Sequence, residues 1–238
     1  MRTIILAAGR GSRLGLLTED TPKPLLPVGE KTIIEHILNA LHSCGVSDVV
    51  IVVGYKGDVI QSKIGDCYGN CHITYVYNDA YDHSDNLYSL WLARKYTASG
   101  MLFLNADTIF HSNILQYFMD SRYADAFLVD TKRKSEANPI VVHAKNNRLV
   151  EIGHTISREV HGIAPGIYKL SETTAPLYFK EAEKLFKNGP RNGGFVIPLQ
   201  ALASMVNLSP IHSDDQRWFN INTPDDYKKA QNLIKTLY

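Results

Sequence analysis

The stretch Ile4-Ile5-Leu6-Ala7-Ala8-Gly9-Arg10-Gly11-Ser12-Arg13-Leu14, followed by Thr21-Pro22-Lys23-Pro24-Leu25-Leu26-Pro27, decides how this chain folds. The apolar run predicts a buried strand, and the glycines after it predict a tight turn whose backbone can approach a ligand. Free backbone N–H groups in such a turn can hold phosphate oxygens. Two cations, Arg13 and Lys23, follow on a loop whose path the prolines fix. This combination suits a polyanion such as a nucleoside triphosphate.

Three other interpretations of this turn compete with that one. A Walker A loop ends in Gly-Lys-Ser/Thr, and no such ending follows Gly11. The dinucleotide-binding fingerprint needs a third glycine at the position where Leu14 stands. A glycine turn can also simply end a strand, but Arg13 and the Thr-Pro-Lys-Pro-Leu run are then unexplained. We therefore expect a different kind of phosphate-binding turn.

The same residues carry a resemblance to a known family. Leu6 to Arg13 and the run from Pro22 to Pro27 resemble the signature of the sugar-nucleotidyltransferase superfamily. The segment Asn86-Leu87-Tyr88-Ser89-Leu90-Trp91-Leu92-Ala93 is similar to the branch that contains choline-phosphate cytidylyltransferases. The resemblance covers nearly the whole chain, and its N-terminal motif is the more specific of the two. It implies a nucleotidyltransferase or GT-A-like α/β fold.

The composition is that of an ordinary globular protein. The chain has 238 residues, which suit one large domain, and its formal net charge of +1 creates no field that recruits nucleic acid or membrane. Cys44, Cys67 and Cys71 lack the spacing of a zinc site and predict free thiols in a reducing cytosol. Because no apolar run reaches membrane-spanning length and no signal peptide is convincing, we expect a cytoplasmic protein.

The first half of the chain alternates strands with helices. Thr32-Ile33-Ile34-Glu35 is a capping-box pattern, and the helix that it starts is expected to stop at Gly45. The β-branched run Val49–Val53 predicts a strand that is buried on both faces. Further strands are expected at 73–77 and 101–104, and helices at 59–64 and 87–96. The alternation predicts a single α/β domain with a doubly wound, mostly parallel mixed sheet.

In the second half of the chain, strands and helices no longer alternate regularly. Strands are expected at 126–129, 139–143, 149–152 and 162–170, with a hairpin turn at Asn146-Asn147. Helices are expected at 173–187 and 195–205, and a last helix begins with Thr223 as N-cap and Pro224 at its first position. We expect residues 1–110 to form a nucleotide-binding half. Residues 111–238 would complete the sheet and supply the acceptor pocket.

Two cations and one carboxylate carry the expected chemistry. The resemblance implies that Arg13 contacts the β- and γ-phosphates, and a planar guanidinium binds phosphate oxygens in pairs. It implies that Lys23 neutralises charge that develops on the α-phosphate. Asp107 ends an apolar strand, where carboxylates of a parallel sheet face the ligand crevice, and the matching family residue holds Mg²⁺. The alternatives are two solvated surface cations and an aspartate that starts a turn.

The C-terminal motif departs from the family pattern. Members commonly carry Trp-x-Glu-Ile-Asp, whose acidic residues assist the metal, whereas this chain has Trp218-Phe219-Asn220-Ile221-Asn222. Asn222 can still ligate through its amide oxygen, so we expect Asp107 and Asn222 at the metal. Most of the negative charge around the metal would then come from the nucleotide. The two amides also favour a second hypothesis, a nucleotide-binding module without turnover.

The remaining expected site residues would contact the nucleoside. Asn86 and Ser89 lie at the start of a predicted helix, and an asparagine can read a pyrimidine edge because it donates and accepts. An ordinary N-cap at Asp85 or Asn86 is the alternative. The resemblance, with backbone groups of Ala8 and Gly9 at the base, extends the expected nucleotide-binding set to Leu6, Ala7, Ala8, Gly9, Gly11 and Ser12.

Two clusters bear on the acceptor. Aromatic residues, which could cage a trimethylammonium group but more often belong to a core, gather at Tyr75, Tyr77, Tyr81, Tyr88 and Trp91. Lys132, Arg133 and Lys134 could receive an acceptor phosphate, although a solvated charge run is the ordinary interpretation. Neither cluster identifies the acceptor.

The sequence thus predicts a Mg²⁺-dependent cytidylyltransferase. It would join CMP from CTP to a small phosphorylated acceptor, phosphocholine first, and release pyrophosphate. The partners would be small molecules, without nucleic acid or membrane. A sugar-1-phosphate nucleotidyltransferase and a non-catalytic module remain alternatives. A glycosyltransferase of similar fold would show an Asp-x-Asp pair, but Asn105 replaces its first member. The acceptor, the base and the oligomeric state stay open at this point.

Overall fold

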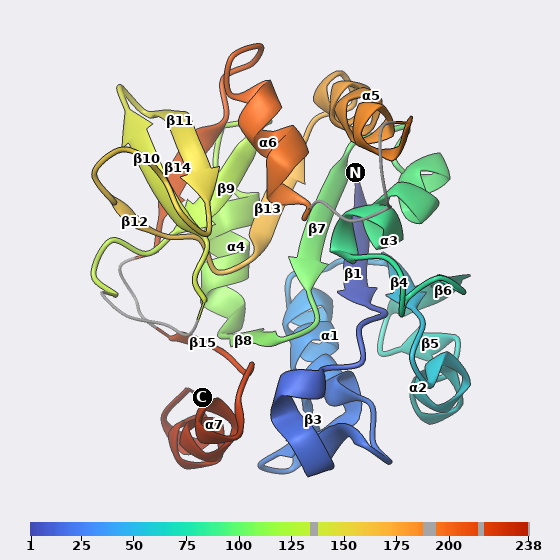
Figure 1. Cartoon of the computed structure of the whole chain (residues 1–238). Coiled ribbons are helices and arrows are strands. Elements are labelled where there is room, and N and C mark those ends of the chain that lie inside the picture. Colours follow the sequence, from blue (N-terminus) through green and yellow to red (C-terminus); the bar gives the residue numbers. More distant parts are fainter. Residues whose placement is uncertain (134–137, 188–193, 214–216, 238) are drawn as a thin grey trace.

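One sheet runs through the whole molecule. The computed structural model describes residues 1–133, 138–187, 194–213 and 217–237, and within them eight strands form a sheet in the order β14-β9-β13-β7-β1-β4-β6-β5 (Figure 1). Strands β1 to β7 of this sheet come from the first half of the chain, and β9, β13 and β14 come from the second. The chain therefore forms a single α/β domain whose two halves share one sheet.

The sheet is mixed but mostly parallel. Parallel pairs join β1 to β4 and β7, β4 to β6, and β9 to β14, whereas β13 is antiparallel to both of its neighbours. Its strands are β1 (Arg2–Ala7), β4 (Asp48–Val53), β5 (Cys67–Tyr68), β6 (Cys71–Tyr77), β7 (Met101–Asn105), β9 (Ala126–Val129), β13 (Ile167–Leu170) and β14 (Ser209–His212). The doubly wound, mostly parallel mixed sheet expected from the sequence is confirmed.

Smaller sheets flank the main one. The strand pair nearest the expected site consists of β8 (Thr108–Phe110) and β15 (Trp218–Asn220), which are antiparallel. The remaining short strands are β2 (Pro27–Val28), β3 (Lys31–Thr32), β10 (Val141–Lys145), β11 (Arg148–Gly153) and β12 (Gly162–Ile163). Strands β10 and β11 form the expected hairpin, and both turn residues, Asn146 and Asn147, have positive φ angles of 52° and 56°.

Helices cover both faces of the sheet. They are α1 (Ile33–Ser43), α2 (Gly57–Ile64), α3 (Asn86–Leu92), α4 (Ser112–Met119), α5 (Thr174–Lys187), α6 (Val196–Leu202) and α7 (Pro224–Leu237), with 3₁₀ helices η1 (Ser12–Thr18), η2 (Lys23–Leu25) and η3 (Ala93–Tyr96). Buried residues of α1, α2, α4 and α7 belong to one core cluster, and those of α3, α5 and α6 belong to another. No helix in the described ranges is long and apolar enough to cross a membrane.

Strand β1 lies between the two core clusters. Ile5 and Ala7 belong to one cluster, and Ile4 and Leu6 belong to the other. Because successive side chains of a strand point to opposite faces, a strand buried on both sides must be apolar at every position. This is why residues 4–7 of β1 are all apolar, and Val49–Val53 of β4 follow the same rule.

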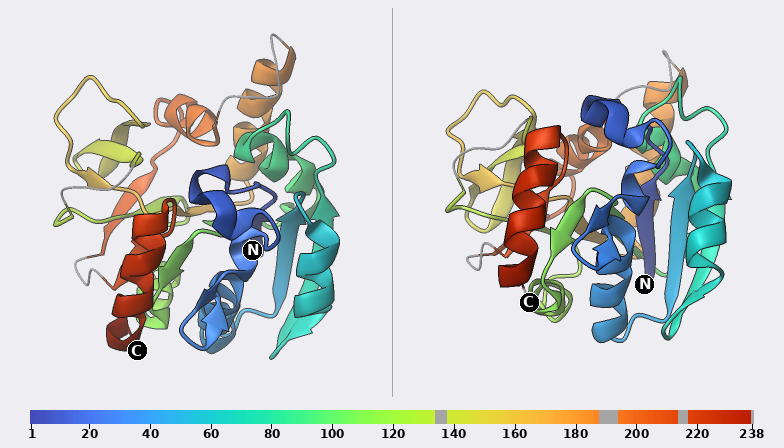
Figure 2. Two further views of the ribbon diagram at one scale, coloured as in Figure 1. Left: turned by 60° about the horizontal axis from the view of Figure 1, so that its bottom comes forward. Right: turned by 90° about the horizontal axis from the view of Figure 1, so that it is seen from below.

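The last helix packs against the N-terminal segment (Figure 2). The Tyr227 hydroxyl donates to the Pro27 carbonyl at 2.7 Å, and Gln231 Nε2 donates to the same oxygen at 2.6 Å. Gln231 Oε1 in turn accepts from the Gly29 N–H at 3.1 Å. Helix α7 is therefore tied by its side chains to the loop that follows Lys23.

Several elements were not predicted from the sequence, and for four of them the physical reason is plain. Strands β8 and β15 have three residues each, too few to show a period. Helix α4 begins at His111, whose Nδ1 accepts from the Asn113 N–H, an N-cap that standard helix signals do not include. Strand β14 contains Pro210, which is tolerated because β14 lies at the edge of the sheet.

The strand expected at 162–170 is in fact two strands, β12 and β13. The extended strand is interrupted between them at Ala164, Pro165 and Gly166. Gly166 has a φ of +95°, and a Cβ atom there would lie 2.6 Å from the Asn105 amide nitrogen. A glycine is required for this close approach, and it brings the Pro165 carbonyl toward the end of β8.

Helix α1 begins with the expected capping box. The Glu35 N–H donates to Thr32 Oγ1 at 3.4 Å, and the Thr32 N–H donates to Glu35 Oε2 at 2.7 Å. Burial raises the pKa of the Glu35 carboxyl, but the hydrogen bonds from Thr32 help to hold that pKa below its ordinary value. Two backbone donors at the helix start are satisfied in this way.

Replacing Thr32 with alanine is expected to lower the free energy of unfolding by about 1 kcal/mol, because the Glu35 N–H loses its acceptor. Urea denaturation followed by circular dichroism measures the change. Thr32→Ser keeps a hydroxyl and should retain most of the stability. Equal unfolding midpoints for Thr32→Ala and the wild type would contradict the capping role.

Candidate active site

A cleft opens where β1 and β7 end side by side. Both strands point toward the same edge of the sheet, with the N-terminal loop and α7 beyond it (Figure 1). The cleft has a volume of about 270 Å³. The residues that line it are Leu6, Ala7, Gly9, Gly11, Ser12, Arg13, Lys23, Pro24, Asn86, Asn105, Ala106 and Asp107. Most of the residues expected at the site from the sequence therefore meet here.

The loop after β1 is held in place by its own backbone. Gly11 has a φ of +71°, and a Cβ atom there would lie 2.9 Å from the Lys23 Cβ, so the loop passes Lys23 only with glycine at this position. The Thr18 hydroxyl lies 3.1 Å from the Gly11 carbonyl. The Tyr55 hydroxyl donates to the Glu19 carbonyl at 2.6 Å and fixes the far end of the loop.

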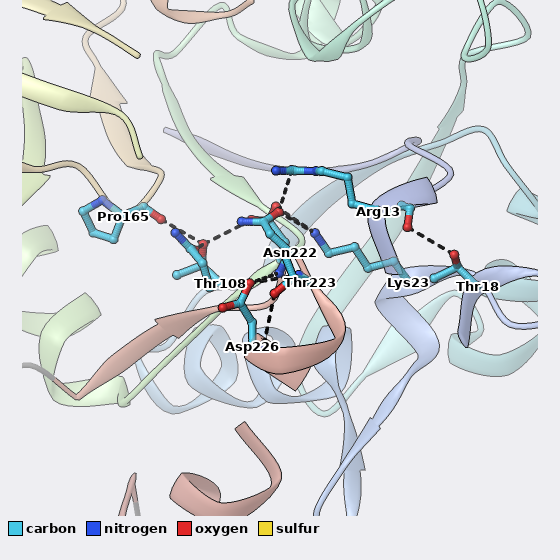
Figure 3. A network of polar contacts seen from close by, with 11 residues as sticks. Arg13, Thr18, Lys23, Thr108, Pro165, Asn222, Thr223 and Asp226 are labelled. Carbon is cyan, nitrogen blue, oxygen red and sulfur yellow. Dashed lines mark hydrogen bonds and ion pairs between the residues drawn. The ribbon is translucent and has the colours of Figure 1, made fainter. Parts of the chain in front are cut away.

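Four residues distant in sequence form one polar network (Figure 3). Lys23 Nζ donates to Asp107 Oδ2 at 3.0 Å and to Asn222 Oδ1 at 3.1 Å. Arg13 Nη2 donates to the same Asn222 oxygen at 2.9 Å. The Lys23 side chain is 12 % exposed, whereas Arg13 is open to solvent. The two cations expected from the sequence thus converge on the two expected metal ligands.

Asn222 is held by the start of α7. A side-chain oxygen of Asp226 accepts from the backbone N–H groups of Asn222 at 3.1 Å and Thr223 at 2.9 Å. The Asp226 N–H donates back to Thr223 Oγ1 at 3.2 Å, which confirms Thr223 as the N-cap. The cap therefore fixes the backbone whose side chain receives Arg13 and Lys23.

Asn220 has a different environment from Asn222. Its Oδ1 lies 2.5 Å from the Thr108 hydroxyl, which is also 2.8 Å from the Pro165 carbonyl and 3.3 Å from Asp107 Oδ1. The buried hydroxyl of Thr108 thus connects β8, β15 and the segment before β13 next to Asp107. Asn220 therefore supports, through the Thr108 hydroxyl, the turn between β7 and β8 that carries Asp107.

Comparison with known proteins identifies the family. The model of the family described as "MobA-like NTP transferase domain" matches residues 3–163, which include the glycine loop, Lys23, Asn86 and Asp107. The chain belongs to this family. It is a nucleotidyltransferase.

Two curated relatives and one solved structure illustrate the similarity. The transferase is 36 % identical over 119 residues to a choline-phosphate cytidylyltransferase of Streptococcus pneumoniae, a match that covers 49 % of this chain and 48 % of the relative. It is 26 % identical over 249 residues to a CTP:phosphoglutamine cytidylyltransferase of Campylobacter jejuni, with 95 % and 97 % covered. The structure of the CTP:phosphocholine cytidylyltransferase LicC from Streptococcus pneumoniae shares the fold, with a TM-score of 0.77, 23 % identity and 98 % of both chains covered.

These similarities show the family and leave the acceptor open. The transferase spans about half the length, or less, of several curated relatives that it matches. A UTP–glucose-1-phosphate uridylyltransferase of Haloferax volcanii matches comparably well, with 31 % identity over 150 residues that cover 62 % of this chain and 61 % of the relative. The nucleotide and a phosphorylated acceptor are the substrates that the family implies.

The donor set of the transferase fits a magnesium ion that is bound together with a nucleotide. Asp107 offers a carboxylate and Asn222 an amide oxygen, and both lie within 3.1 Å of Lys23 Nζ. Oxygen ligands are those that Mg²⁺ prefers, and it usually keeps water and substrate phosphates in its shell. No group of three or more histidine, cysteine, aspartate or glutamate side chains that could hold a metal occurs among the described residues. The phosphates would therefore complete the coordination.

A smaller hollow of about 90 Å³ adjoins the cleft. It is lined by Leu6, Ala8, Gly9, Asn78, Tyr81, Ser84, Asp85, Asn86 and Ser89. The expected nucleotide-binding residues Ala8 and Ser89 lie here, and Leu6, Gly9 and Asn86 border both spaces. It lies beside the glycine loop, where the sequence predicts the base.

Asp85, and not Asn86, is the N-cap of α3, since Asp85 Oδ1 accepts from the Leu87 N–H at 2.9 Å. The alternative interpretation of Asn86 as the N-cap of α3 is therefore excluded. Ser89 is buried, and its hydroxyl accepts from Asn78 Nδ2 at 2.9 Å. Sequence analysis did not select Asn78, although a polar residue directly after an alternating strand was a usable signal.

The aromatic residues considered for an acceptor cage do not form one. Tyr88 and Trp91 pack together with Phe186, with ring centroids 5.6 to 5.7 Å apart. Tyr75 donates to the Gly65 carbonyl. Tyr77 bonds Asp58 and Gln61, and the Tyr81 ring lies against Tyr55. Among the described residues these side chains fill separate places, so the cage hypothesis is not supported.

The basic cluster is not a solvated charge run, at least at Arg133. Its guanidinium lies 3.8 Å from the centre of the Trp218 ring and donates to the Trp218 carbonyl at 2.6 Å. The backbone N–H groups of Lys132 and Arg133 both donate to buried Asp130. The expectation was therefore wrong for Arg133, because cation–π stacking and the Asp130 turn fix it against β15. Lys134 lies outside the described residues.

Proposed function

We propose that the transferase joins CMP from CTP to a small phosphorylated acceptor and releases pyrophosphate. The observation that carries this proposal is the convergence of Arg13, Lys23, Asp107 and Asn222 at the mouth of the cleft. Two cations and two oxygen ligands in one place suit a metal-bound triphosphate. The base hollow beside the same loop suits the nucleoside of that triphosphate.

The reaction needs no covalent protein intermediate. An oxygen of the acceptor phosphate attacks the α-phosphorus of CTP, and a new P–O bond forms. The bond between the α-phosphorus and the bridging oxygen breaks, and pyrophosphate leaves with that electron pair. Lys23 would neutralise charge at the α-phosphate, and exposed Arg13 would bind the β- and γ-phosphates. Asp107 and Asn222 would hold Mg²⁺, which neutralises phosphate charge when it is bound.

The acceptor is proposed to sit against the second half of the chain, residues 111–238, with residues 1–110 holding the nucleotide. Phosphocholine is the first candidate, because a choline-phosphate cytidylyltransferase is among the relatives that match. The absence of an aromatic cage from the described residues favours testing other acceptors with equal care. A sugar 1-phosphate is the second candidate, since a uridylyltransferase for glucose 1-phosphate matches comparably well.

The proposal is tested by pyrophosphate release. The protein is incubated with Mg²⁺ and each of the four ribonucleoside triphosphates, with phosphocholine, phosphoglutamine or glucose 1-phosphate as acceptor. Reactions without acceptor correct for hydrolysis. We expect acceptor-dependent release that is fastest with CTP. Equal rates with CTP and UTP would remove the cytidylyl assignment, and CTP binding without turnover on any acceptor would favour the non-catalytic module.

A further inference from the structure

The amide of Asn86 is fixed in one orientation by the backbone of the second half of the chain. The Phe195 N–H donates to Asn86 Oδ1 at 3.2 Å across 109 residues of sequence. A backbone N–H can only donate, so the atom that faces it must be the amide oxygen and not the amide nitrogen. If the amide were flipped, Asn86 Nδ2 would face the Phe195 N–H, and two hydrogen-bond donors would oppose each other. The Nδ2 group of Asn86 is therefore turned away from Phe195.

The neighbouring residue strengthens this lock. Asp85 Oδ2 accepts from the Gly194 N–H at 2.5 Å, while Asp85 Oδ1 caps α3. Two successive side chains at the start of α3 thus hold two successive backbone N–H groups at the start of α6. Because both bonds use the same short segment, the Asn86 amide cannot rotate without breaking this junction.

The free end of the amide is the part that Asn86 offers to a ligand. Asn86 lines both the phosphate cleft and the base hollow. Its Nδ2 group has no hydrogen-bond partner among the residues that the structure describes, whereas its Oδ1 is engaged. The hydroxyl protons of Ser84 and Ser89 are directed to backbone carbonyls of Ala80 and Asp85. A base in the hollow whose N3 edge faces Asn86 would therefore meet a fixed N–H donor.

Cytosine and uracil differ at the atoms that such a donor can recognise. Ring nitrogen N3 of cytosine carries a lone pair and accepts, whereas N3 of uracil carries a hydrogen and donates. Both bases accept at O2. A donor-only group aimed at N3 therefore bonds cytosine and opposes uracil. An asparagine that could flip would serve either base.

We propose that Asn86, locked by the Phe195 N–H, is the residue that selects cytosine over uracil in this transferase. The inference rests on the proposed function, because it assumes that the base of the nucleotide occupies the hollow beside α3. It goes further by naming Asn86 Nδ2 as the group that contacts the base. It also names the bond from the Phe195 N–H as the contact that makes this group a donor. The second half of the chain then takes part in nucleotide selection through Phe195.

The test is the variant Asn86→Asp. A carboxylate keeps the bond from the Phe195 N–H through one oxygen and replaces the outward N–H donor by an acceptor. Uracil N3–H can then donate, whereas cytosine N3 meets a lone pair. The ratio of kcat/KM for CTP to kcat/KM for UTP is expected to fall by about tenfold or more, as expected for one hydrogen bond lost and one gained. Because the added charge repels both triphosphates alike, it cancels in the ratio.

Asp85→Asn is the matched control. It weakens the Gly194 contact, and so the junction between α3 and α6, and leaves the Nδ2 donor of Asn86 in place. Because Asp85 also lines the hollow, the rate with both nucleotides can fall. Its CTP-to-UTP ratio should stay near the wild-type value even if the rate falls. An unchanged ratio in Asn86→Asp, or the same fall in Asp85→Asn, would overturn the proposal.

Binding measurements separate this inference from the proposed function. Equilibrium titration of CTP and UTP, by tryptophan fluorescence or calorimetry, yields the same ratio without turnover. Turnover of the wild type with CTP and an unaltered ratio in Asn86→Asp would refute Asn86 as the selector and leave cytidylyl transfer intact. A protein that turns over no acceptor but whose CTP-to-UTP binding ratio falls in Asn86→Asp would support the selector and refute the transfer reaction.

Discussion

Replacing Asp107 with alanine is expected to nearly abolish nucleotidyl transfer while the fold survives. Of the described residues that line the cleft, Asp107 is the one with a carboxylate. Its side chain is 27 % exposed and sits at the end of β7, so removing it leaves the sheet intact. A hard dication then loses the carboxylate among the described residues of the cleft, and Lys23 loses its ion-pair partner. Pyrophosphate release measures the loss, and circular dichroism checks the fold.

Two further variants separate the charge of Asp107 from its shape. Asp107→Asn keeps the size and the hydrogen bond from Lys23 but removes the charge, so it should be nearly as inactive as alanine. Asn222→Asp adds a carboxylate beside the same lysine and should lower the Mg²⁺ concentration for half-maximal rate. It need not raise the maximal rate. If Asp107→Asn retains full activity, the metal role of Asp107 is wrong. An unmoved magnesium curve for Asn222→Asp places Asn222 away from the metal.

Alanine at Arg13 or at Lys23 is expected to lower turnover by at least about tenfold, because each removes a charge-assisted contact to phosphate of roughly 1.5–3 kcal/mol. Both side chains reach the same Asn222 oxygen at the mouth of the cleft. Loss of Arg13 should mainly raise KM for the nucleotide, because the β- and γ-phosphates are bound before the reaction. Loss of Lys23 should mainly lower kcat, because charge develops at the α-phosphate during it.

Arg10→Ala is the matched control for these two variants. It removes the same charge from the same loop, but the Arg10 guanidinium lies over the Tyr55 ring, 5.5 Å from its centre, and Arg10 does not line the cleft. Its kcat/KM should stay within about threefold of the wild type, as is usual for a surface substitution. Unchanged turnover in both Arg13→Ala and Lys23→Ala would remove the proposed triphosphate site.

The parts of the fold that the sequence predicts are those that are determined by residues close together in the chain. Residues 4–7 of β1 are all apolar because both faces of the strand are buried there, and the Thr32–Glu35 capping box consists of four adjacent residues. The glycine at position 11 is needed for a local reason as well, a positive φ next to Lys23. Such features leave a pattern in a short window of sequence.

The parts that the sequence does not predict depend on partners far along the chain. Nothing near Asn86 indicates that its amide oxygen meets the Phe195 N–H. Arg133 reads as one of three adjacent cations, and only the position of Trp218 takes it out of solvent. The Thr108 hydroxyl likewise owes its surroundings to Pro165 and Asn220. Tertiary contact decides these side chains, and a single sequence carries no local sign of it.

The bond between Arg13 and Asn222 joins residues 209 positions apart, and α7 is tied to the loop after Lys23 by Tyr227 and Gln231. During synthesis at about 5–20 residues per second, the glycine loop leaves the ribosome long before its partner exists. The nascent chain therefore carries two cations whose acceptor has yet to be made. Closing so long a loop is also a late and slow event in folding. A ribosome-bound chain that lacks α7 should accordingly form a nearly complete sheet but catalyse no transfer. The chain should become able to catalyse transfer only when the last turns of α7 have been made.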